Sequence, residues 1–149
     1  MATGKLSSVL ANVVSVLHAA GYTRARWSYL PIQDRADADT LLINVFPGGQ
    51  LTGGVALDRE TRGRRLWTYT VTVWVMQALG PRETVDDAQV DAVLQHVETI
   101  AAALQDSYLT AQANIIDVAI DPIAEPGMLN EENVCASAIL LTIEKSEAI

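Results

Sequence analysis

Three carboxylates in the C-terminal third of the chain, Asp117, Asp121 and Glu125, have the side chains that general acid/base or metal chemistry needs. Asp117 and Asp121 are four residues apart in a segment with strand character, so a regular strand places them on the same side. The other side of that segment is apolar, and carboxylates opposite an apolar row usually form the solvated face of a strand. The pattern therefore favours a solvated face over a catalytic or metal site.

The histidines, the one cysteine and a glycine-rich stretch also lack the surroundings that chemistry requires. His18 and His96 each lie alone on a predicted helix, without Cys or Glu at metal-ligand spacing, as ordinary polar helix residues do. Cys135 lies in a predicted strand without a nearby base, which favours a small core residue. Residues 47–54, PGGQLTGG, lack the Lys-Ser/Thr pair of a phosphate-binding loop and favour an irregular edge segment. We therefore predict no enzyme, no metal and no cofactor.

A cluster of positive charge is the remaining candidate site, and it consists of Arg59, Arg62, Arg64 and Arg65. The cluster holds four of the ten basic residues, whereas the chain has 18 acidic residues and a formal charge of −8. Two interpretations remain open: the solvated tip of a hairpin, or a contact surface for an acidic partner. The acidic balance of the whole chain argues against DNA binding, because phosphate recognition needs Lys and Arg.

The length and composition of the chain predict one domain, residues 1–149, because half of its 149 residues are hydrophobic. With one cysteine no intrachain disulfide is possible, which favours a reducing compartment. The N-terminus shows no signal-peptide core, and no apolar run approaches the roughly 20 residues of a bilayer span. We expect no contact with a membrane.

Two amphipathic helices are predicted on either side of the most regular strand. Residues 5–20 carry apolar side chains at helical spacing, and Gly21 follows as a C-terminal stop. The second helix begins near Thr84, a suitable N-cap, with Asp86 and Asp87 in its first turn. Its buried stripe is predicted to consist of Val90, Val93, Leu94, Val97, Ile100, Ala101 and Leu104.

The most regular strand covers residues 65–76, RLWTYTVTVWVM, where β-branched and aromatic residues alternate. At about 3.3 Å per residue it spans roughly 35 Å. A typical strand has about five or six residues, so this strand is about twice the usual length. Its inward face is predicted to consist of Trp67, Tyr69, Val71, Val73 and Val75.

Shorter strands are predicted around Trp27, at 40–46, within 51–57, at 115–121 and at 134–144. In the strand at 115–121, Ile116, Val118 and Ile120 are expected to face inward. Residues 122–133 are predicted to be a loop that joins the last two strands as a hairpin. The predicted fold class is α+β: a mainly antiparallel sheet, two amphipathic helices packed on one face, and a long β-hairpin arm at 47–65.

This arrangement resembles the tail terminator proteins of long-tailed bacteriophages, the lambda-type family, over nearly the whole chain. The resemblance begins with an N-terminal helix, LSSVLANVVSVLHAAGY, followed by TLLINVFPGG. A polar turn then leads into RGRRLWTYTVTVWVMQAL, and an acidic helix start into TVDDAQVDAVLQHVETIAAAL. A strand pair ends the pattern, IIDVAIDPIAEPGMLNEENVCASAILLTIEK. Related neck and tail-completion proteins share much of this pattern.

The resemblance implies a structural virion protein that forms a ring, usually of six subunits, at the head-proximal end of the tail. Such a ring caps the tail tube, stops its polymerisation and provides the head-joining surface. The implied partners are further copies of the chain, the tail tube protein and a head–tail connector protein. The protein would be in the host cytoplasm during assembly and then in the neck region of the virion.

The charge of such a ring agrees with a passage for DNA. Six copies at −8 each carry −48, and an acidic lumen repels the phosphate backbone. DNA would then pass through the central hole without specific binding. A strand longer than a small domain requires could also contribute to an arm that lies against the next subunit and helps to close the ring.

Two alternatives stay open from the sequence. One is another head–tail connector or a minor tail protein, which belongs to the same assembly class. The other is a small cytoplasmic enzyme or ligand-binding domain, with the carboxylates near Asp121 as its site. A closed ring would favour the assembly class, and a monomer with a deep polar pocket would favour the enzyme.

Overall fold

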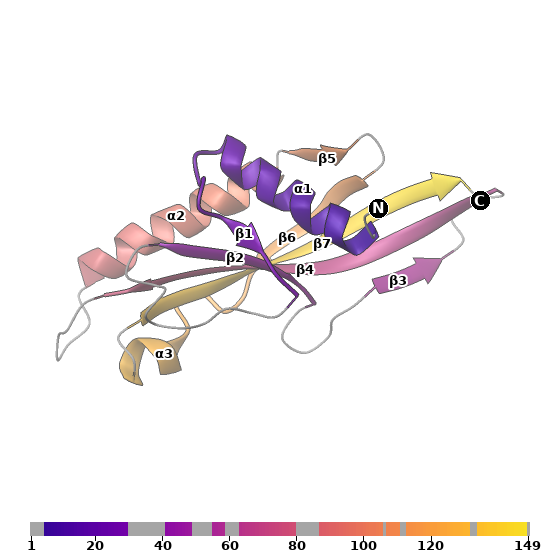
Figure 1. The fold of residues 1–149 in the computed structure, drawn as a ribbon. Coiled ribbons are helices and arrows are strands. Elements are labelled where there is room, and N and C mark those ends of the chain that lie inside the picture. Colours follow the sequence, from indigo (N-terminus) through magenta and orange to yellow (C-terminus); the bar gives the residue numbers. More distant parts are fainter. Residues whose placement is uncertain are drawn as a thin grey trace.

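The helices and strands follow one another in the predicted order, and two further short elements, β5 and α3, are present (Figure 1). The computed structural model of the chain describes residues 5–29, 41–48, 55–58, 63–79, 87–105, 107–110, 113–131 and 134–148. In chain order the elements are α1 (Lys5–Ala19), β1 (Arg26–Trp27), β2 (Leu42–Pro47), β3 (Val55–Asp58), β4 (Arg64–Ala78), α2 (Asp87–Gln105), β5 (Tyr108–Thr110), β6 (Ala113–Ile120), α3 (Pro126–Glu131) and β7 (Val134–Ala148).

Seven strands of the described ranges form one sheet, in the order β1-β2-β4-β7-β6-β5, with β3 pairing with β4. Only β1 and β2 run parallel, and the other pairs in these ranges are antiparallel. Helices α1 and α2 lie together on one face of the sheet (Figure 1). The predicted fold class, α+β with a mainly antiparallel sheet and two packed helices, is confirmed.

The long predicted strand is β4, and it is paired along its whole length. Its 15 residues pair with the 15 residues of β7 without a shift in register, from Arg64 opposite Ala148 to Ala78 opposite Val134. On its other side, β4 pairs first with β3 and then with β2. The full length of β4 is therefore used in strand pairing within the chain. Strand β7 is also longer than the predicted 134–144.

The inward face of β4 is confirmed, because its alternate residues pack against both helices. Tyr69, Val71, Val73 and Val75 are at most 1% exposed, and Trp67 packs against the same cluster while partly buried. The helices contribute the stripes that the spacing predicts: from α1 mainly Val9, Leu10, Val13 and Leu17, and from α2 Val97, Ile100 and Leu104. Removal of these side chains from water stabilises the sheet–helix layer.

The ends of the two helices agree in part with the sequence. Gly21 follows α1 with a φ of +103°, a conformation that favours glycine. Thr84 and Asp86, the predicted start of the second helix, lie outside the described residues, and α2 begins at Asp87. In the described part of the chain, no helix combines the length and the apolar character that a membrane span needs.

A short helix replaces part of the loop predicted at 122–133. Helix α3 begins with Pro126, which suits a first helical position, and the Glu125 carboxylate accepts the Met128 N–H at 2.7 Å as a cap. Met128 packs against a second apolar cluster, which includes Trp74 and Met76 from the outward row of β4. The loop prediction was wrong here because Pro122, Pro126 and Gly127 are typical of loops, whereas tertiary burial and the cap stabilise a turn of helix.

The side assignment of Ile116 was wrong because β6 contains an irregularity. Ile115 pairs with Ile143 and Asp117 with Thr142, so Ile115 and Ile116 together occupy the space of one residue on β7. Ile115 therefore packs against the core, and Ile116 is 52% exposed. Val118 and Ile120 face the core as predicted.

The long β-hairpin arm stays a prediction. Strands β3 and β4 pair antiparallel, from Val55 opposite Tyr69 to Asp58 opposite Leu66. Residues 59–62, which would form the tip, and residues 49–54 lie outside the described residues. The described pairs establish a hairpin-like register but no arm that leaves the domain.

Val73 provides a test of the core. We expect Val73→Asp to lower the free energy of unfolding by at least about 3 kcal/mol, because it buries an unpaired charge at a site that is 0% exposed. Thr70→Asp, on the outward face of the same strand, should cost much less. Urea unfolding followed by circular dichroism measures both. Equal stability of Val73→Asp and the parent would contradict the inward face.

Candidate interaction surfaces

Two of the four clustered arginines lie at the start of β4, where the chain itself holds them. The Arg64 Nε donates a hydrogen bond to the Ser146 Oγ at 2.9 Å. The Arg65 guanidinium lies 3.8 Å from the Glu147 carboxylate, a long ion pair on a largely exposed side chain that stabilises little by itself. Arg59 and Arg62 lie outside the described residues. The structure thus places half of the predicted cluster at one end of the β4–β7 ladder.

Glu147 connects this end of the ladder to the core. The Trp67 Nε1 donates a hydrogen bond to Glu147 at 2.8 Å, and the Trp67 and Tyr69 rings stack with centroids 6.4 Å apart. Burial, and then the negative charge of Glu147, raise the pKa of Tyr69. These contacts join the start of β4 to the end of β7, and Arg64 and Arg65 lie at this joined end.

The C-terminal end of α1, which includes His18, is closed by backbone hydrogen bonds. The Gly21 N–H donates to the His18 carbonyl at 3.1 Å and the Tyr22 N–H to the Leu17 carbonyl at 2.9 Å, a bond pattern that closes a helix C-terminus. His18 then contacts the Ala25 carbonyl through Nε2 at 2.8 Å. Because a carbonyl oxygen only accepts, Nε2 carries the hydrogen. His18 therefore ties the end of α1 to the start of β1.

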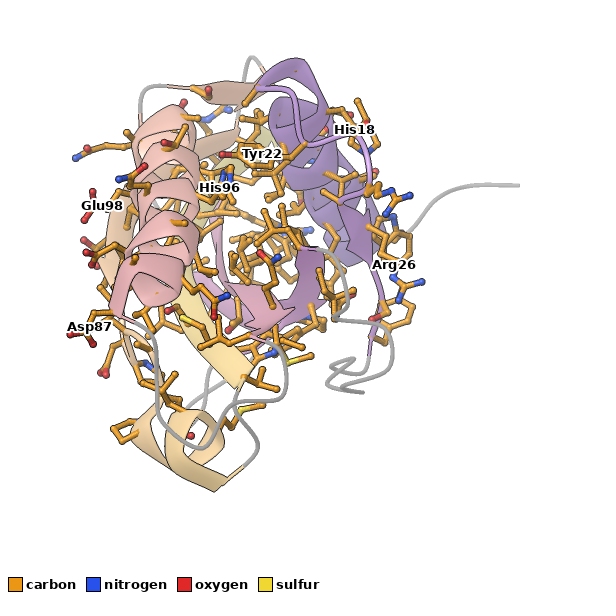
Figure 2. The ribbon with its side chains drawn as sticks, turned by 90° about the vertical axis from the view of Figure 1, so that its left-hand side faces the viewer. His18, Tyr22, Arg26, Asp87, His96 and Glu98 are labelled. Atoms are coloured by element: carbon orange, nitrogen blue, oxygen red, sulfur yellow. The ribbon has the colours of Figure 1, made fainter. Side chains whose placement is uncertain are left out.

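His96 of α2 contacts Tyr22, which lies just after the end of α1. Its Nδ1 lies 3.0 Å from the Tyr22 hydroxyl, and the two rings meet edge to face with centroids 5.7 Å apart (Figure 2). Burial raises the pKa of Tyr22, and a hydrogen bond with Thr99 opposes that shift. The contacts of both histidines are structural.

The described structure does not assemble the three candidate carboxylates into a metal-holding group. Asp117 and Asp121 are exposed, whereas Glu125 caps α3. Within the described ranges, no group of three or more His, Cys, Asp or Glu side chains is placed to hold a metal ion. Asp117 and Asp121 thus lie on a solvated face, as the apolar pattern of the strand predicted.

The glycine-rich stretch is described only at its start. The Gly48 N–H donates to the Thr70 carbonyl at 2.7 Å, and the Thr72 hydroxyl donates to the Gly48 carbonyl at 2.5 Å. Gly48 has a φ of +89°, which favours glycine. These bonds use the Gly48 backbone to continue the β2 edge along β4.

A shallow hollow of about 250 Å³ lies between the end of α1 and β2. None of its lining residues is a carboxylate, a histidine or a cysteine, so it does not unite the candidate chemical groups. The residues that line the hollow are Gly21, Tyr22, Thr23, Arg24, Leu41 and Ile43.

Among the residues that the structure describes, four large apolar side chains are exposed, which sequence reasoning missed. They are Tyr29 at 57%, Leu57 at 53%, Ile116 at 52% and Ile123 at 49% exposure. Ile116 lacked a local signal, because the irregularity in β6 that turns it outward depends on pairing with β7. Exposed apolar residues beside charged ones are typical of contact surfaces.

No family model matches this chain, and no curated protein sequence matches it. The resemblance to phage tail terminators therefore stays a prediction from the order and pattern of the elements. The fold belongs to the α+β class, and among the described residues no group of three or more His, Cys, Asp or Glu side chains is placed to hold a metal ion.

The placement of Cys135 in the core can be tested by its reactivity. Burial raises the pKa of its thiol to about 11, and the side chain is 0% exposed. At about pH 8 the thiol is protonated and covered, whereas the thiolate is the reactive form. We expect almost no reaction of the native protein with a thiol-reactive disulfide reagent, and one equivalent in guanidinium chloride. Rapid reaction of the folded protein would contradict this placement.

Proposed function

We propose that this protein is a phage tail terminator, a structural virion protein that forms a ring at the head-proximal end of the tail tube. The ring ends polymerisation of the tube and provides the surface that joins the head. The observation that carries this proposal is the element order, because the helix, the long central strand, the second helix and the final strand pair follow the family pattern along the chain. The proposed location is the neck of the virion, after assembly in the host cytoplasm.

The rigid ladder of β4 and β7 supports this function physically. A terminator needs one face that binds the last tube subunits and another face that refuses further ones. Loops that vary on a fixed sheet can provide both faces. The proposed carriers are residues 47–65 and the connection from Pro122 to 133, which join elements held by the sheet.

The negative charge supports a channel for DNA. Six copies would carry −48, and repulsion from phosphates lets DNA slide without specific binding. The arginines at 59–65 are the proposed contacts with an acidic surface of the next subunit or the tube. Charge pairs at the rim of an interface act mainly on association and weaken with salt.

The decisive experiment compares phage particles with and without this protein by electron microscopy. Without a terminator the tube continues to polymerise, so we expect overlong or ragged tails that fail to join heads. Complementation with the parent chain should restore the tail length. Tails of normal length that are already attached to heads would refute the proposal and favour another connector.

The arginine cluster has its own test, the double variant Arg62→Glu/Arg64→Glu. We expect it to fold as the parent does, by circular dichroism, but to reduce the number of tailed particles. Arg62→Lys/Arg64→Lys keeps the charge and serves as the matched control. Normal assembly of the glutamate variant would leave the cluster as a solvated turn.

A further inference from the structure

The charges of the chain are divided between its two parts. Residues 1–82 hold nine of the ten basic and five of the 18 acidic residues, a net charge of +4. Residues 83–149 hold one basic residue, Lys145, and the other thirteen acidic residues, a net charge of −12. The total is the −8 of the whole chain. Such an asymmetry in sequence matters only if the fold keeps the two parts separate.

The sheet does keep them separate. The first part builds α1 and strands β1 to β4, and the second builds α2, α3 and strands β5 to β7. Because β4 and β7 are neighbours at the centre, strands of the first part lie on one side and strands of the second on the other. Figure 2 shows Asp87 and Glu98 of α2 on one side of the molecule and Arg26 on the opposite side.

Each of the two parts of the chain also has exposed apolar side chains beside its exposed charges. Tyr29 lies close to the exposed Arg26 in the chain and packs edge to face on Trp27, with ring centroids 5.3 Å apart. Ile116 and Ile123 flank the exposed Asp117 and Asp121 in the chain. We call Arg24, Arg26 and Tyr29 the β1 surface. We call Ile116, Asp117, Asp121 and Ile123 the β6 surface.

The β6 surface also offers a backbone edge. Strand β5 pairs with Ala113 and Asn114 of β6, so no described strand covers the edge from Ile115 to Ile120. An uncovered strand edge with exposed apolar residues is prone to association with another chain. The aspartates make this edge attractive to a partner that brings positive charge.

We propose that the β1 surface of one copy docks on the β6 surface of a second copy of this chain. The two surfaces have opposite charge, and each contributes apolar area, which is the composition of a specific interface. Contact of two β1 surfaces or two β6 surfaces would bring like charges together. The association is therefore head to tail, and repetition gives a ring or a filament. It deepens the proposed ring and rests on that function only for its place in the virion.

Cysteine trapping tests the geometry. A chain with both Tyr29→Cys and Ile116→Cys is treated with a short bismaleimide, which tolerates small errors in the paired positions. Since the two sites lie at opposite edges of the sheet, head-to-tail contact should give a ladder of trimers and larger species on a denaturing gel. Each single variant should give dimers at most, and the buried Cys135 should not contribute. Absence of species larger than dimers from the double variant would overturn the proposal.

Charge exchange tests the chemistry. Arg26→Glu alone and Asp117→Lys alone should each weaken self-association about tenfold at low salt, measured by sedimentation velocity. An equimolar mixture of the two variants should associate as the parent does, because every head-to-tail contact then pairs opposite charges. A symmetric dimer that pairs the β1 and β6 surfaces reciprocally would gain the same rescue, and the ladder of trimers and larger species in the trapping experiment distinguishes the head-to-tail arrangement from it. Failure of the mixture, or a parent that remains monomeric at about 0.01 M salt, would also overturn the proposal.

These measurements use the purified full chain and remain distinct from the virion experiment. Head-to-tail association together with tails of normal length would support the interface and refute the terminator function. A defect in tail length together with no trapping would support the terminator function and refute this pair of surfaces. Circular dichroism of each variant confirms that the fold is retained.

Discussion

Strands β4 and β7 hydrogen-bond to each other in unbroken register from Arg64 opposite Ala148 to Ala78 opposite Val134. A slip by one residue would turn every inward side chain to the other face of the sheet. The register is fixed because Val73 lies opposite Ile139 in one apolar layer, which both helices cover. Strands β2, β3 and β6 pair directly with this ladder, and β1 and β5 are placed through β2 and β6.

The ladder has two unlike faces, and this explains the third helix. On the face opposite α1 and α2, β4 changes from partly buried threonines, Thr68 and Thr70, to the buried Trp74 and Met76. Threonine tolerates contact with water, whereas Trp74 and Met76 need an apolar cover. Met128 of α3 packs against the same cluster as they do. Helix α3, which the sequence pattern predicted to be a loop, thus covers apolar side chains of β4.

Periodicity predicted the parts of the fold that bury regular rows of side chains, such as the inward face of β4 and the stripes of both helices. It failed at Ile116 and α3, where pairing or burial by distant residues decides the local conformation. The candidate site shows the same limit. The contact between Trp67 and Glu147 joins residues 80 positions apart, and no local pattern indicates it. Arginine spacing likewise predicts a charged turn but not that Ser146 holds Arg64.

The same central pairing separates the charges that the chain carries. From β1 to β6 the sheet order has four inter-strand steps, which at about 4.8 Å each correspond to roughly 19 Å. The Debye length at physiological salt is about 8 Å, so attraction between exposed charges at the two edges of one sheet is largely screened. Arg26 and Asp117 therefore gain little from each other inside one chain. A second copy that places these edges in contact, as proposed, removes that distance, so the opposite charges attract more strongly across the contact than within one chain.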